Sequence, residues 1–221
     1  LAHRMGQDRL ALETGCGEGF IRCVTVDPAG FFYLDLNIWR TLPDAISLRV
    51  LIRVISSLGT KRFGPQLAKV ENLCAELKGN EEFNSATLAG ARIISYKKSL
   101  LVCREPRSIT DNLELDAGAI QLWDGRFRIY VPTTVSLRGK CTVGKLGSRD
   151  WINLKKYIIP GKSRVNRIPI PVFTSLPAVR DLDGVAAVPH LNYVRDLSIS
   201  GCLAIFSPAN VEAKNSFSQI A

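Results

Sequence analysis

The spacing of hydrophobic residues changes near residue 82, and this change constrains the fold of the 221-residue chain more than any other feature. Before it, apolar residues recur every three or four positions over 43–58 and again over 65–78, as on the buried side of an amphipathic helix. Thr41 is a possible N-cap for the first helix, and Gly59 is a typical stop. We therefore expect two helices that pack as an antiparallel hairpin.

After this point apolar residues alternate with polar ones, a pattern typical of strands. Strands are expected at 91–96 and 100–104, joined by a polar turn. A hairpin is expected over 121–131, because Asp124-Gly125 accepts the positive φ angles of a tight type I′ turn. The sequence therefore predicts an α+β fold.

The same pattern predicts two domains. Residues 1–82 are expected to form a small helical domain, and residues 83–221 a β-rich, mostly antiparallel domain. Gly15-Cys-Gly-Glu-Gly19 has the glycine content of a phosphate-binding loop. Because no strand precedes it and no clear helix follows, we interpret it as a flexible connector.

Cysteine and histidine usage argues against both zinc and disulfides. The six cysteines include no C-x-x-C pair, and only two histidines are present. Cys74, Cys103 and Cys202 lie in apolar segments, where a free thiol behaves as a small buried hydrophobe, so a reducing, cytoplasmic location is expected. The most apolar stretch is too short and too charged to span a membrane. Since the chain does not begin with Met, we expect it to be part of a longer protein.

Positive charge is concentrated in one segment. The net charge is +9, and residues 137–167 hold nine Lys and Arg against Asp150 alone, a net +8 in that segment. Such a cluster favours a polyanion, and nucleic acid is the commonest one in the cytosol. A solvated loop, an anionic membrane and an acidic protein partner are the alternatives. Trp151 and Tyr157 are interleaved with the charges, so the segment is expected to pack against the fold.

No set of residues with catalytic spacing is found. Pro160-Gly-Lys-Ser163 resembles the end of a phosphate-binding loop, but Lys156 stands where the first glycine would have to be. His190 follows a proline and has no nucleophile motif near it, which favours a structural role. Asp181 and Asp183 lie beside an expected turn, where aspartate is common. We assign no catalytic and no metal-binding residue.

Several segments, taken in order, resemble the C-terminal, non-catalytic region of bacterial tRNA(Ile)-lysidine synthases. Their order and spacing carry the resemblance, which spans most of the chain. The segments are Phe32–Leu36, Leu58–Pro65, Ala86–Ile93, Leu101–Pro106, Leu122–Phe127, Leu176–Val185 and Val188–Tyr193.

This resemblance implies an enzyme that uses ATP to activate the wobble cytidine of tRNA-Ile and then joins lysine to it. In that family an N-terminal domain holds ATP, with magnesium, through a Ser-Gly-Gly-x-Asp-Ser loop. The one Ser-Gly pair here, Ser200-Gly201, is followed by Cys202, so the ATP site maps onto no position of this chain. The chain alone is therefore expected to be inactive. Its expected partners are tRNA-Ile and the missing catalytic domain, with a homodimer as a further option.

A tRNA-holding region must recognise its ligand mainly by shape and phosphate backbone. The residues expected to contact RNA are Lys61, Arg62, Arg138, Lys140, Lys145, Lys155, Lys156, Lys162, Arg164 and Arg167. Trp151 and Tyr157 could stack on an exposed base, although core packing is favoured for both. The alternative function is a protein-interaction or general RNA-binding domain with a basic docking surface.

Overall fold

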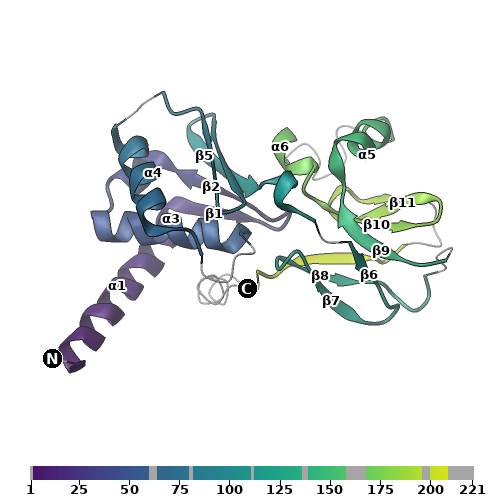
Figure 1. The fold of residues 1–221 in the computed structure, drawn as a ribbon, viewed down its shortest axis with the longest axis horizontal. Helices are drawn as coiled ribbons and strands as arrows, with labels where there is room; N and C mark the ends of the chain where they lie inside the picture. The colour runs from purple at the N-terminus through teal and green to yellow at the C-terminus, as the bar shows by residue number, and fades with distance from the viewer. Residues whose placement is uncertain are drawn as a thin grey trace. The chain divides into compact units, whose positions relative to one another are not determined.

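The computed structural model describes residues 2–59, 64–79, 82–110, 112–135, 139–157, 168–195 and 200–208. It confirms the α+β class, with helices and three mostly antiparallel sheets (Figure 1). The described chain divides into two compact units. The N-terminal unit comprises residues up to Asp27 together with Phe31–Cys103, and the C-terminal unit comprises Pro28–Gly30 and Arg104–Pro208.

The N-terminal unit combines helices with a five-stranded sheet of order β1-β2-β5-β4-β3. The two predicted helices are confirmed as α3 and α4, and the two predicted strands as β4 and β5. Thr41 does not cap α3, which begins after Pro43 without a side-chain cap. The elements are α1 (Ala2–Cys23), β1 (Val24–Asp27), β2 (Phe31–Asp35), α2 (Leu36–Arg40), α3 (Asp44–Leu58), α4 (Leu67–Gly79), β3 (Ser85–Leu88), β4 (Ala91–Tyr96) and β5 (Ser99–Arg104).

The boundary between the two units lies later in the chain than the sequence predicts. Strands β3 to β5, which the sequence assigned to a second domain, join the same sheet as β1 and β2, and Phe32 pairs with Val102 across β2 and β5. The first 82 residues are therefore not a helical domain of their own, and the units divide between Cys103 and Arg104. Strands β1 and β2 have only four and five residues, too few for their alternation to stand out between helices.

The glycine-rich segment is helical, which corrects the expectation of a connector. Gly15 and Gly19 are one turn apart in α1, on the side that meets α3. A Cβ atom added at Gly19 would lie 3.0 Å from Ile46 Cγ2 and 3.2 Å from Leu42 Cδ1. The glycines thus let the two helices approach closely, and this packing overrides their low helix propensity.

Replacing Gly19 by Leu should lower the free energy of unfolding by roughly 1–3 kcal/mol, because a full side chain must displace α3 from α1. Gly17 is the matched control, since a Cβ atom there meets nothing within 4 Å. Gly17→Leu should instead stabilise the chain by about 0.5–1 kcal/mol through helix propensity. Chemical denaturation followed by circular dichroism measures both. Equal effects of the two substitutions would contradict this packing.

The C-terminal unit is built from two sheets that enclose a core. A five-stranded sheet has the order β12-β11-β10-β9-β6, and a three-stranded sheet has the order β13-β8-β7. The elements are η1 (Pro106–Ser108), β6 (Leu113–Glu114), β7 (Ile120–Trp123), β8 (Phe127–Tyr130), β9 (Thr142–Lys145), α5 (Gly147–Leu154), α6 (Ile170–Phe173), β10 (Pro177–Asp181), β11 (Gly184–Val188), η3 (Pro189–Leu191), β12 (Tyr193–Val194) and β13 (Leu203–Phe206).

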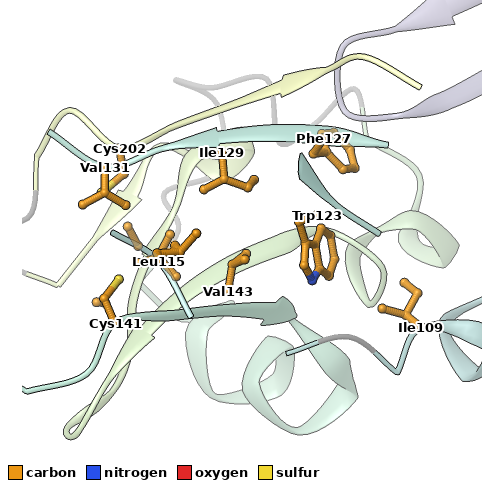
Figure 2. Close-up of a cluster of buried hydrophobic side chains, with 12 residues drawn as sticks. Ile109, Leu115, Trp123, Phe127, Ile129, Val131, Cys141, Val143 and Cys202 are labelled. Atoms are coloured by element: carbon orange, nitrogen blue, oxygen red, sulfur yellow. The ribbon is translucent and has the colours of Figure 1, made fainter. Parts of the chain in front are cut away.

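Apolar side chains of both sheets meet between them, as Figure 2 shows. Phe127 and Ile129 of the small sheet and Val143 of the large one are at most 1% exposed. The predicted hairpin is confirmed, with φ angles of 46° at Asp124 and 57° at Gly125. Its turn places Trp123 and Phe127 opposite one another, and their rings stack with centroids 6.2 Å apart.

The six cysteines are free and buried, which confirms the prediction made for Cys74, Cys103 and Cys202. Burial raises the pKa of Cys23 to about 12 and the pKa values of Cys74 and Cys141 to about 11, so these thiols are protonated at neutral pH. Over the residues with described positions, no group of three His, Cys, Asp or Glu side chains could hold a metal ion. No helix in that part of the chain is long and apolar enough to cross a membrane.

Candidate nucleic-acid interface

Helix α5 and the turn that follows it carry Arg149, Lys155 and Lys156 of the basic segment, and backbone contacts fix where the helix begins. Gly147 has a φ of +73°, which lets the chain turn sharply out of β9. The Leu146 amide donates to Leu176 O at 2.8 Å, and the Gly147 amide donates to Thr174 O at 3.1 Å. Arg180 donates to the carbonyl oxygen of Lys145 at 2.7 Å. Hydrogen bonds with β10 and with the turn before it therefore fix the backbone at the start of α5.

One side of α5 is packed. The Trp151 ring stacks on Phe173 of α6 with centroids 3.9 Å apart and an interplanar angle of 11°. Leu154 is buried, and Asp150 accepts a 2.9 Å ion pair from Arg180. Trp151 is thus a packing residue of the α5–α6 pair, the alternative that the sequence favoured.

The opposite side of α5 is exposed and basic. Arg149 and Ile152 are three residues apart on one face of α5, and Lys156 is exposed in the turn that follows the helix. Lys155 is exposed in the same turn. Tyr157 is 64% exposed, which corrects the expectation that it packs in the core, and Lys156 Nζ lies 4.9 Å from its ring centroid. We call Arg149, Lys155, Lys156 and Tyr157 the basic face. Among the residues that the structure describes, its three cations have no ion-pair partner.

The other expected RNA contacts divide into three groups. Lys140 is exposed and pairs with exposed Glu114 at 3.1 Å. Lys145 is half-buried, and its Nζ donates to Pro106 O at 2.7 Å and to Ile109 O at 3.0 Å, so it holds the turn at η1. Six expected contacts lie outside the described residues: Lys61, Arg62, Arg138, Lys162, Arg164 and Arg167.

Arg149 was counted in the basic segment but not assigned an RNA contact from the sequence. Its three-residue spacing to exposed Ile152 is the available signal, and using that signal requires recognising α5 as a helix. The α5 helix is only eight residues long and begins at a glycine, which made it hard to predict.

The residues weighed for catalysis have structural contacts. His190 Nε2 lies 2.9 Å from Pro28 O, and its ring packs edge-on against Phe127 at 5.2 Å. Asp181 accepts two hydrogen bonds from Arg195, at 2.8 and 2.6 Å, and a third from the amide of Asp183. These contacts fix loops and strand ends of the C-terminal unit.

A buried ionic cluster supports this unit. The Asp124 carboxylate accepts from Arg104 Nε at 3.1 Å and Arg104 Nη2 at 2.9 Å, and from Arg126 Nε at 2.6 Å. All three residues are at most 3% exposed. Arg104 also donates to Ser108 O, and Arg126 donates to Ser175 O. The cluster therefore ties the hairpin turn to η1 and to the turn before β10, which accepts the first amides of α5.

Replacing Asp124 by Asn should lower the free energy of unfolding by about 3–5 kcal/mol, because two buried guanidinium groups lose their counter-charge. Glu114→Gln is the matched control, since it removes a carboxylate from an exposed ion pair that contributes little. Denaturant titration of both variants measures the difference. Similar midpoints for the two variants would show that the cluster does not hold the fold together.

Comparison with known proteins gives one consistent result. No family model matches the chain. A tRNA(Ile)-lysidine synthase of Wolbachia pipientis wMel is 27% identical over 186 residues, covering 79% of this chain and 38% of the relative. The enzyme of the same name from the Wolbachia of Brugia malayi is 27% identical, covering 80% of the chain and 39% of the relative. That from Ruegeria pomeroyi is 28% identical over 58% of the chain.

The chain is homologous to tRNA(Ile)-lysidine synthases. It spans about two fifths of the length of the two Wolbachia enzymes while most of its own length is matched. This pattern is consistent with a C-terminal region of a tRNA(Ile)-lysidine synthase, as the resemblance of its segments predicted.

Proposed function

We propose that this chain takes part in tRNA modification as the tRNA-holding C-terminal region of a tRNA(Ile)-lysidine synthase. Two independent observations support the proposal. The homologues carry that name, and the described part of the +8 segment presents three exposed cations on α5 and the turn that follows it. The basic face is the observation that carries the binding role, because it gives the charge cluster a defined position on the fold.

The basic face suits a phosphate backbone. Lys155 and Lys156 are flexible point charges, and Arg149 can present a planar fork to one phosphate. Contacts of this kind fix position on an RNA without reading its sequence. Tyr157, which is mostly exposed, adds a ring on which an unpaired base can stack. The side chain of Lys145 points to the backbone near η1, so we expect it to contribute less to binding than the cations of the basic face.

The covalent chemistry of the enzyme is assigned outside these 221 residues. The sequence has no Ser-Gly-Gly-x-Asp-Ser loop, and we therefore expect ATP, magnesium and lysine to bind a catalytic domain of the complete enzyme. In this proposal the C-terminal region binds tRNA-Ile in the cytoplasm and holds it for that domain.

Exchanging Arg149, Lys155 and Lys156 together for Gln tests the binding role. Each phosphate contact contributes about one unit to the slope of log affinity against log salt, so the slope should flatten by about three units. At 0.1 M salt the affinity for tRNA should fall on the order of 100-fold, with little dependence on tRNA sequence. Fluorescence anisotropy titrations at several salt concentrations measure both quantities.

The matched control exchanges Arg9, Arg22 and Lys69, which are three exposed cations of α1 and α4, for Gln. This variant loses the same charge and should keep more of the affinity and nearly the full salt slope. If both triple variants bind tRNA as the unmodified chain does, the basic face is not an RNA surface. Binding of an acidic protein would then be the better explanation of the charge.

A further inference from the structure

The turn between β4 and β5 carries two exposed lysines, Lys97 and Lys98. Neither lysine has an ion-pair partner among the residues that the structure describes. Asp35 lies on the neighbouring strand β2, where it pairs with Ser99, but its carboxylate caps α2 by accepting the Ile38 amide at 3.1 Å. The charges of both lysines are therefore available to an external anion.

The backbone at Lys97 has a conformation that is unfavourable for lysine. Its φ angle is +57°, in the left-handed region where the Cβ atom of an L-residue is crowded. Glycine, asparagine and aspartate are the residues that usually occupy such positions in turns. In the part of the chain that the structure describes, the other positive φ angles fall on glycines and on Ala89, Asp124 and Asn192. Within that part, Lys97 is the one long side chain held in this conformation.

Two stacked rings support the Lys97 side chain. Its Nζ lies 5.4 Å from the ring centroid of Tyr96, and the Tyr96 ring stacks on Tyr33 of β2 with centroids 5.9 Å apart. An ammonium group has three donors, so contact with one ring face leaves donors free for a phosphate oxygen. The rings thus restrict the Lys97 side chain without neutralising its charge.

A strained residue that is kept at a turn indicates a role other than stabilising the fold. Glycine would relieve the crowding at this position, and backbone strain of this kind is concentrated at binding sites. Lysine adds a positive charge there, and Lys98 adds a second. Lysine is a flexible point charge that binds phosphate groups, which makes an RNA backbone the polyanion that fits this turn.

We propose that Lys97 and Lys98 form a second phosphate-binding site for RNA, in the N-terminal unit. The inference rests on the tRNA-binding role proposed above and extends it, because neither lysine belongs to the basic face or to the C-terminal unit. The two lysines bind the RNA backbone without reading its sequence. Both units of the chain then contribute to the affinity for tRNA.

Replacing Lys97 by Gly in the 221-residue chain separates binding from stability. The substitution relieves the crowded backbone, so the melting temperature should rise by roughly 2–4 °C. It also removes one phosphate contact, so the slope of log affinity for tRNA against log salt should flatten by about one unit. At 0.1 M salt the affinity should fall about fivefold. Thermal unfolding followed by circular dichroism and fluorescence anisotropy titrations measure these quantities.

Two further variants complete the experiment. Lys97→Gly combined with Lys98→Gln should flatten the salt slope by about two units. Ala89→Gly is the matched control, because Ala89 has a φ angle of +50° in the turn between β3 and β4 and carries no charge. This control should raise the melting temperature by a similar amount and leave the affinity for tRNA and the salt slope unchanged.

Two results would overturn the second site alone. In the first, the double variant keeps the affinity and the slope of the unmodified chain, while the exchange of Arg149, Lys155 and Lys156 weakens binding. In the second, Lys97→Gly lowers the melting temperature while Ala89→Gly raises it, which would show that lysine itself stabilises the turn. If neither set of substitutions changes tRNA binding, the tRNA-binding role is wrong, and the second site is wrong with it.

Discussion

The carboxylate of Asp124 lies between the two buried guanidinium groups of Arg104 and Arg126, and the packing at the start of α5 depends on this arrangement. Charges this deeply buried are stable only when paired and hydrogen-bonded. Arg104 and Arg126 each reach a backbone carbonyl as well as the carboxylate, at Ser108 and Ser175. Residues adjacent to Ser175 then accept the first amides of α5. A local ion cluster thereby fixes the starting point of the surface that we assign to RNA.

Two of the sequence segments that resemble the lysidine synthases meet in this cluster. Leu101–Pro106 contains Arg104, and Leu122–Phe127 contains both Asp124 and Arg126. From sequence alone the Asp-Gly pair was interpreted only as a hairpin turn, and that interpretation is confirmed. The ion pairs join residues twenty positions apart, and no periodicity reports such a contact. The structure therefore gives these two segments a physical role, which their resemblance to the lysidine synthases did not reveal.

Local pattern predicted the elements that are long or have a clear turn signal. Helices α3 and α4 and strands β4 and β5 belong to this class. The errors come from tertiary packing. Gly15 and Gly19 reduce the helix propensity of α1, yet their lack of side chains is what allows α3 to pack against it. The sequence shows that positive charge is concentrated over 137–167, but it does not show where each side chain points. The Lys145 ammonium, for example, donates to two backbone carbonyls near η1.

Hydrogen–deuterium exchange on this chain, with and without saturating tRNA-Ile, tests most directly whether the basic face holds RNA. We expect slower exchange in peptides covering residues 147–157 when tRNA is bound, because phosphate contacts restrict opening of α5 and of the turn that follows it. We also expect that raising the salt to 0.5 M removes this protection together with binding. Unchanged exchange over 147–157 under saturating tRNA, with protection confined to α4 or absent, would contradict the account.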